Sequence, residues 1–304
     1  MINYPKKYIK KFFPWLPEHL SRVKKAQIIR DVAEILSKLN PPQYYDSDKV
    51  FEHLQNSYDP RTGYGYDSFS TWERGVQRVQ KLLERVASLQ TPGISVLYAG
   101  CGDGMTGHAF VQYGHKVKLI DFEDWRDPRA KDIPFFCGNL CKQLPFDSNQ
   151  FDLVCSYNAF EHFNNPEITF KELLRVCKPG GHICLEFGPL YNSSWGLHAY
   201  RTITMPYSQF LFSQKKLLFK LNQFGIHDLG KSQTVLQPLN KWSVEQFCSL
   251  WNTPVCEIIW LKKIKDFSNL KIIINYPKSF TGLALTLEDV TTNALCAILK
   301  KKLG

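Results

Sequence analysis

Short segments rich in apolar and β-branched residues alternate with helical segments from residue 94 onward. Seven of them predict buried strands, at 94–100, 116–121, 133–140, 151–158, 182–188, 255–264 and 293–301. Helices are expected near 104–113, 166–177 and 243–251. Strands that alternate with helices pair in parallel through right-handed crossovers. The sequence therefore predicts an α/β fold built on a doubly wound, mostly parallel, seven-stranded sheet.

The two parts of the chain outside this alternation differ from it in pattern. Before it, a helix is expected over 20–39, stopped by Asn40-Pro41-Pro42, then a tyrosine-rich and glycine-rich link. A second helix follows over 70–89, with Ser70 or Thr71 as its N-cap. After the fifth strand the alternation breaks over residues 190–242. We expect a helical extension at 1–90, a sheet domain at 91–189 and 243–304, and an inserted substrate cap at 190–242.

Charge and cysteine content limit the partners and the compartment. The net charge is +10, and residues 1–40 hold nine Lys or Arg against three acids, a charge of +6. With the aromatic residues among them, this segment is a candidate for peripheral contact with an anionic membrane. A solvated helical face that packs on the main domain is the favoured alternative. Nucleic acid is not expected as a partner, and the oligomeric state stays open.

Nine cysteines show no paired spacing of the kind that binds zinc, and Cys137-x-x-x-Cys141 lacks a His or Cys pair beside it. No metal site is therefore expected. No apolar run reaches the roughly 18 residues that a membrane span needs, and no secretory signal is recognisable. Reduced thiols in a cytoplasmic protein are the expectation.

A glycine-rich turn follows the first predicted strand. Gly100, Gly102 and Gly104 let the backbone approach a ligand without interference from a Cβ atom. A match to the dinucleotide fingerprint at Gly102, Gly104 and Gly107 starts two residues too late. Asp121 ends the second strand, where an acid accepts hydrogen bonds from both ribose hydroxyls of an adenosine cofactor. Neither feature alone decides which cofactor binds.

Downstream motifs favour one cofactor. Asn139 follows Gly138, and then come LPFD at 144–147, FDLV at 151–154, Glu161-His162 and KPGG at 178–181. With the glycine turn, this ordered set resembles the class I S-adenosylmethionine-dependent methyltransferase superfamily, in its type 11 small-molecule group. The resemblance is close over 94–188, loose over 243–303 and slight in the first 90 residues. It implies a Rossmann-like fold, an enzyme, and S-adenosyl-L-methionine as cofactor.

The resemblance also implies roles for residues at matching positions. The glycines would line the methionine part, Asp121 would hold the ribose and Phe122 would pack on the adenine. Asn139 stands where the family has an acid facing the adenine amine. The implied cofactor-binding set is Gly100, Gly102, Gly104, Asp121, Phe122, Asn139, Leu140, Tyr157 and Asn158. Tyr98 replaces an acid that helps to hold the cofactor ammonium in the family, so another acceptor must take that place.

Catalytic candidates lie after the fourth and fifth strands. His162 and His198 are the two histidines there that could take a proton from an acceptor near neutral pH, although His162 could only brace its loop. Tyr191, Trp195 and Tyr200 are expected to contact the acceptor beneath the 190–242 segment, or to form the core of a helical cap. Glu161 ranks behind the histidines. We expect methyl transfer to a small molecule, at oxygen ahead of nitrogen; the alternatives are a non-catalytic cofactor-binding partner and an NAD-dependent oxidoreductase.

Overall fold

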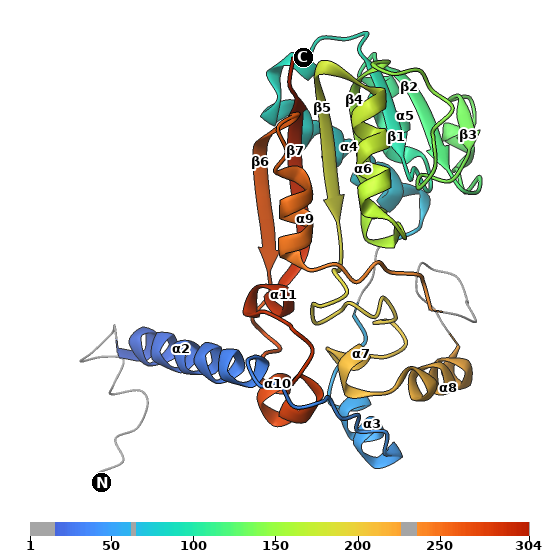
Figure 1. Ribbon diagram of the computed structural model, residues 1–304. Helices are drawn as coiled ribbons and strands as arrows, with labels where there is room; N and C mark the ends of the chain where they lie inside the picture. Colours follow the sequence, from blue (N-terminus) through green and yellow to red (C-terminus); the bar gives the residue numbers. More distant parts are fainter. Residues whose placement is uncertain (1–15, 62–64, 226–235, 304) are drawn as a thin grey trace.

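A seven-stranded sheet forms the upper part of the molecule, and the computed structural model describes residues 16–61, 65–225 and 236–303. The strand order is β3-β2-β1-β4-β5-β7-β6, with β7 antiparallel to both of its neighbours and β1 to β5 paired in parallel. This confirms the mostly parallel, seven-stranded, Rossmann-like sheet (Figure 1). The strands are β1 (Ser95–Ala99), β2 (Lys116–Asp121), β3 (Phe135–Cys137), β4 (Phe151–Tyr157), β5 (Cys177–Phe187), β6 (Cys256–Lys265) and β7 (Thr292–Lys301).

Both faces of the sheet are covered, because successive side chains of a strand point to opposite faces. Leu97 and Ala99 of β1 join a core with α6 (Pro166–Val176) and α9 (Val244–Trp251). Val96 and Tyr98 join a second core with α4 (Ser68–Arg85) and α5 (Met105–Gln112). The burial of apolar surface in the two cores, at about 25 cal/mol per Å², is the main stabilising contribution.

Helix starts follow local capping. Asn165 caps α6 through a bond from Ile168 N, with Pro166 in the first turn, and Ser243 begins α9 with a full capping box. The expected N-cap of α4 was wrong. Asp67 caps this helix by accepting from Phe69 N and Ser70 N, and Ser70 lies inside the first turn. A carboxylate reaches these two donors and also suits the positive end of the helix dipole.

Two other elements differ from expectation. The third strand is only Phe135–Cys137, and it pairs with Leu119–Asp121 of β2. The link after the first helix contains α3 (Asp48–Gln55), which the sequence analysis left without structure. Phe51 and Leu54 of this short helix are buried, so tertiary packing stabilises eight residues that are too few to form a helix alone.

A helical layer lies below the carboxyl ends of the parallel strands (Figure 1). It contains α2 (Leu16–Leu36), α3, α7 (Ser208–Leu211), α8 (Gln214–Phe224), α10 (Lys271–Asn275) and α11 (Leu287–Thr291). These helices share one apolar cluster, drawn from residues 32–54, 197–221 and 270–290. The lower layer is therefore built from three separate stretches of chain, one of them between β6 and β7.

Hydrogen bonds join the first stretch to the other two. Gln55 donates from Nε2 to Thr202 O at 2.8 Å and accepts from Thr204 N at 3.1 Å. Gly282 N donates to Lys38 O at 2.7 Å. These contacts fix the N-terminal helices against the segment that follows β5.

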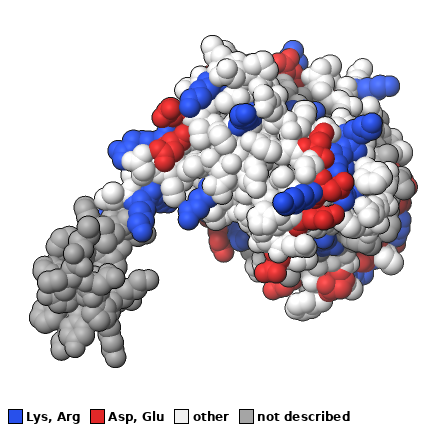
Figure 2. All heavy atoms as spheres, turned by 90° about the horizontal axis from the view of Figure 1, so that it is seen from below, with Lys and Arg blue, Asp and Glu red and all other residues white. Residues whose placement is uncertain are grey.

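Most of the lower face is uncharged, and Lys or Arg and Asp or Glu side chains are interspersed on it (Figure 2). Of the basic N-terminal segment 1–40 considered for membrane contact, residues 1–15 lie outside the described residues. Within the described chain, no helix has the length and apolarity needed to cross a bilayer.

Candidate active site at the carboxyl edge of the sheet

The glycine turn after β1 has backbone angles that favour glycine. Gly100, Gly102 and Gly104 have φ of +68°, +51° and +72°. A Cβ on Gly100 would stand 2.6 Å from Ala159 Cβ, and one on Gly104 would stand 2.9 Å from Ala130 Cβ. A Cβ on Gly102 would meet no protein atom within 4 Å. The turn therefore leaves open space at Gly102 alone among the three.

Asp121 lies at the end of β2, directly beside this turn. Its Oδ2 accepts a hydrogen bond from Gly102 N at 2.8 Å, and its Oδ1 accepts one from Phe122 N at 2.8 Å. Asp121 is only 7% exposed, and burial raises the pKa of its carboxyl above the usual value. Each carboxylate oxygen keeps a second lone pair for a hydroxyl donor.

Three further candidates lie along the same edge. Phe122 is exposed to 69%, with Trp125 edge-on at 6.0 Å between ring centroids. Asn139 is exposed, and its Oδ1 accepts from Cys141 N at 2.8 Å, which fixes its amide. Leu140 is buried in the core beneath them. The ends of β2 and β3 thus present an aromatic ring and an amide beside Asp121.

Tyr157 and Asn158 come at the end of β4. Asn158 has φ +51°, and its N–H donates to Glu186 O at 2.7 Å. Tyr157 is buried, and the Arg78 guanidinium lies over its ring at 4.6 Å. Tyr98 packs edge-on against Tyr157 and is itself 3% exposed, so it belongs to the core below the turn.

A cavity of about 610 Å³ opens beside Tyr157 and Asn158. It meets the predicted cofactor-binding set only at these two residues and extends over the face of β5, β7 and β6. Five basic side chains and one acid, Glu186, line it, a net charge of +4; the basic residues are Arg61, Arg78, Lys81, Arg85 and Lys262. The sequence analysis missed this surface, although Arg78, Lys81 and Arg85 are spaced to share one face of a helix.

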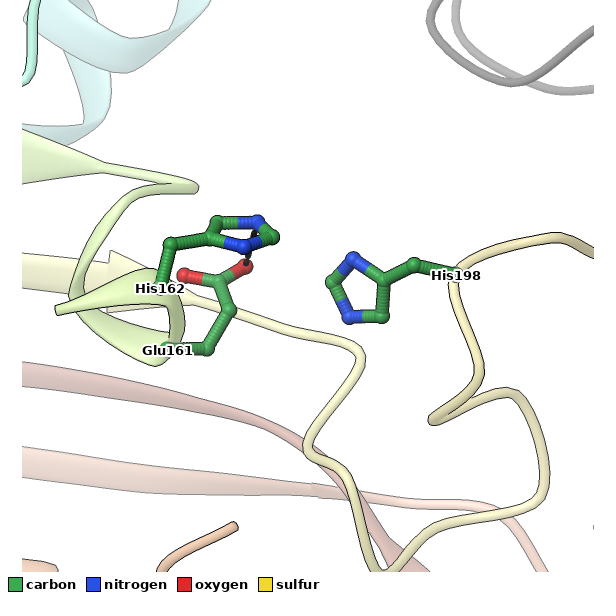
Figure 3. A group of neighbouring side chains, drawn as sticks. All are labelled: Glu161, His162 and His198. Atoms are coloured by element: carbon green, nitrogen blue, oxygen red, sulfur yellow. Dashed lines mark ion pairs between the residues drawn. The ribbon is translucent and has the colours of Figure 1, made fainter. Parts of the chain in front are cut away.

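Glu161, His162 and His198 lie together below β4 (Figure 3). Glu161 and His162 are in the short 3-10 turn Phe160–His162, and His198 comes from the segment after β5. The two imidazole rings are edge-on, with centroids 5.0 Å apart. Asn240 holds the turn by donating to Phe160 O and Glu161 O. The structure brings the two predicted catalytic histidines together.

Hydrogen bonds and burial set the state of these groups. His162 Nδ1 lies 2.8 Å from Pro238 O, and His198 Nε2 bonds Pro189 O. Burial and the neighbouring His162 lower the pKa of His198 to about 3. Burial raises the pKa of Glu161, which is 2% exposed and accepts from Gly188 N at 3.0 Å. Both histidines therefore hold a fixed tautomer, and His198 is neutral at physiological pH.

The three predicted acceptor-contacting residues occupy different surroundings. Tyr200 lines the basic cavity. Trp195 is 7% exposed, with the Arg61 guanidinium over its ring at 4.5 Å. Tyr191 packs edge-on against Phe210 in the lower layer, under the ammonium of Lys241 at 4.9 Å. Of these three, Tyr200 alone faces the cavity.

A family model for a methyltransferase domain matches residues 97–185, from β1 through most of β5. A malonyl-[acyl-carrier protein] O-methyltransferase of Buchnera aphidicola is 32% identical over 47% of this chain and 58% of its own length. A demethylmenaquinone methyltransferase of Renibacterium salmoninarum is 32% identical over 32% of this chain and 45% of its own.

Other relatives are more distant. A ubiquinone biosynthesis O-methyltransferase of Coxiella burnetii is 24% identical over 66% of this chain and 82% of its own. Among solved structures, an S-adenosylmethionine dependent methyltransferase from Mesorhizobium loti is 16% identical over 73% of this chain and 96% of its own, with a TM-score of 0.45. The chain spans only about half the length of the first curated relatives that it matches. Residues 97–185, which contain the glycine turn, Asp121 and the Glu161-His162 pair, match the model of the methyltransferase-domain family.

Proposed function

We propose that this protein transfers a methyl group from S-adenosylmethionine to a hydroxyl oxygen of a small-molecule acceptor. The observation that carries the proposal is the open glycine turn bonded to Asp121 at the carboxyl edge of the sheet. In open α/β sheets, ligands bind at this edge. The space at Gly102 and the spare lone pairs of Asp121 suit an adenosine with two ribose hydroxyls.

The residues that would hold the cofactor follow the edge in order. Asp121 accepts from the ribose hydroxyls, Phe122 covers the adenine, and Asn139 faces its amine. Leu140 supports this part from below, and the backbone of Tyr157 and Asn158 meets the methionine end. When bound, S-adenosylmethionine supplies a methyl group that its sulfonium already activates for in-line displacement. The protein then has to align the acceptor, exclude water and remove one proton.

The acceptor lies between this edge and the lower layer, with Tyr191, Trp195 and Tyr200 as contacts. Residues 190–225 and 236–242 form its cap, and residues 226–235 of the predicted cap lie outside the described residues. His162 and His198 prepare the acceptor hydroxyl, because each donates one ring N–H to a backbone carbonyl and keeps a lone pair on its other ring nitrogen. Methylation at oxygen is favoured over nitrogen, since a hydroxyl needs such help to lose its proton. Two of the relatives named above are O-methyltransferases by name.

The charge of the cavity suggests the class of acceptor. Five cationic side chains against Glu186 favour a ligand with a carboxylate or phosphate. The guanidinium of Arg78 is held over Tyr157, beside the proposed methionine end of the cofactor site. We therefore propose a hydroxylated acceptor whose acidic group enters this cavity.

Calorimetry with S-adenosylmethionine and NAD, followed by transfer of an isotopically labelled methyl group to matched acceptors, tests the proposal. The acceptors are hydroxylated carboxylates, the same compounds as neutral amides, and primary amines. We expect micromolar binding of S-adenosylmethionine, none of NAD, and O-methylation of the acidic compounds. Lys262→Glu should raise the acceptor KM without changing cofactor affinity. Cofactor binding without turnover on any acceptor would favour a non-catalytic partner, and binding of NAD would favour an oxidoreductase.

A further inference from the structure

The Glu161–His162–His198 cluster offers one ligand atom from each residue, all within 4.8 Å of one another. Figure 3 shows the two imidazole rings as neighbours, with the Glu161 carboxylate beside His162. Two imidazoles and a carboxylate are ligands that bind divalent transition ions. The spacing of these residues in the sequence matches no metal-binding motif. Residues 162 and 198 lie far apart in the chain, and the segment after β5 brings them together.

Glu161 supplies the observation that points to a bound cation. Its side chain is buried, and only one of its oxygens is satisfied, by Gly188 N at 3.0 Å. The other oxygen, Oε2, has no hydrogen-bond partner within the described chain and is shielded from solvent. A buried, unpaired carboxylate oxygen is costly, so native proteins pair it with a donor or a cation.

The histidines are oriented in the way that metal-binding histidines are. His162 Nδ1 and His198 Nε2 each bond a backbone carbonyl, of Pro238 and Pro189. Because a carbonyl only accepts, these nitrogens carry the protons, which leaves lone pairs on His162 Nε2 and His198 Nδ1. Backbone carbonyls that fix the tautomer in this way are typical second partners of metal ligands. His198 is also held at φ +57°, a conformation that is uncommon for a non-glycine residue.

Hydrogen bonds within the cluster do not explain it. The closest approach of His162 to Glu161, from Nε2 to Oε1, is 3.9 Å, which is too long for a hydrogen bond. A cation among the three residues would bind the Glu161 carboxylate and the lone pairs of both imidazoles. Tetrahedral ligands at roughly 2.1 Å from one ion lie about 3.4 Å apart. Ligand atoms that are now within 4.8 Å of one another therefore need to close by up to roughly 1.4 Å.

We propose that Glu161, His162 and His198 bind one divalent transition-metal ion, of the zinc or manganese class, with positions left open for a ligand oxygen. Binding of the ion stands by itself; its role in the reaction rests on the proposed function. There the acceptor oxygen binds the ion, its O–H bond breaks and the proton passes to water. The oxygen electron pair then forms the new C–O bond as the C–S bond of the sulfonium breaks.

The site also lies where an acceptor would need it. Gly188 and Pro189, which bond Glu161 and His198, line the basic cavity as well. An anionic acceptor held by the cationic side chains could therefore reach the open positions of the ion. A histidine lone pair cannot bind an ion and take a proton together, so the metal and the histidine-base roles are distinguishable.

Titration of the chelator-treated full chain with Co²⁺, followed by visible absorption, and with Zn²⁺ by calorimetry tests the site. We expect one ion per chain and a rise in thermal unfolding temperature on binding. Glu161→Gln, His162→Gln and His198→Gln should each weaken binding at least about tenfold. His53→Gln, at an exposed position of helix α3, is the matched control and should leave binding unchanged. The partly exposed His162 is the safe substitution should a buried variant fail to fold.

Each outcome bears on one proposal. Absence of binding, or binding that survives in the His162→Gln and Glu161→Gln proteins, would overturn the metal site. Methyl transfer at the full rate after a chelator has removed the metal would overturn the role of the ion in the reaction and support a histidine base. One ion bound through these residues, with no transfer to any acceptor, would support the site and count against the proposed function instead. In chelator, Glu161→Gln should be at least as stable as the wild type, because it removes a buried unpaired carboxylate.

Discussion

Replacement of Asp121 by alanine should separate cofactor binding from the stability of the turn. The structure assigns its two oxygens to Gly102 N and Phe122 N, each at 2.8 Å, and leaves two lone pairs for the ribose. Hydrogen bonds to a charged acceptor contribute about 1.5–3 kcal/mol each, and water recovers part of this in the variant. We expect a net loss of about 1.5–3 kcal/mol in binding of S-adenosylmethionine.

At about 1.4 kcal/mol per factor of ten, this loss raises the dissociation constant roughly 10- to 150-fold. Isothermal titration calorimetry measures the constant, and thermal unfolding reports the loss of the two backbone bonds. Asp152→Ala is the matched control, because Asp152 bonds Ser95 N at 2.8 Å and Lys178 Nζ at 2.7 Å near the start of β1 and β4, at the opposite edge. It should lower stability and leave affinity unchanged. A folded Asp121→Ala protein with wild-type affinity would refute the assignment of Asp121 to the cofactor site.

Four further substitutions test other parts of the molecule. Gly102→Val should lose cofactor binding, because its side chain enters the open space of the turn, and its φ of +51° should cost it some stability. Gly100→Val should destabilise the fold more, because its side chain also collides with Ala159. Calorimetry and thermal unfolding distinguish the two, and cofactor binding by Gly102→Val would contradict the model of the turn. Glu172→Gln should cost about 1–3 kcal/mol at pH 7, because Arg175 and Leu144 N bond this carboxylate and lower its pKa. A carboxyl whose pKa is lowered by folding stabilises the protein above its pKa in the unfolded chain, about 4.3. The stability difference between wild type and Glu172→Gln should therefore shrink as the pH falls below that value. A difference that does not depend on pH in denaturant titrations would refute the reasoning. Phe280→Ala should cost about 3–5 kcal/mol in chemical denaturation, because the ring is fully buried against Tyr207 and Phe210; an unchanged midpoint would show that the lower layer does not unfold with the sheet.

The sheet was predictable because its information is local. Runs such as those around Leu97 and Val154 are apolar and bounded by turn residues, and their alternation with helices determines parallel pairing. Helix α3 was not predictable in the same way, since Phe51 and Leu54 become buried only against residues far along the chain. The α4 start was misplaced because Ser70 is as good a cap as Asp67 by residue type.

The candidate site divides along similar lines. The glycine turn and Asp121 follow strands in the sequence, so their meeting at one edge follows from topology. The basic cavity does not, because Lys262 of β6 meets Arg78 and Arg85 only after the sheet is complete. The orientation of His162 and His198 beside Glu161 depends on the backbone carbonyls of Pro238 and Pro189, and residue type alone does not predict such contacts.

The composition of the lower layer has a consequence for the order in which the chain folds. The buried residues Val32 and Leu36 of helix α2 pack with α10 and α11, which lie far along the chain. Contacts so distant in sequence form late, because the loop that they close must first be ordered. We therefore expect α2 to stay undocked until α10 and α11 have formed, with its apolar side open to chaperones in the meantime. Docking of α2 would then follow the folding of the sheet, and the lower layer would be complete only after that step.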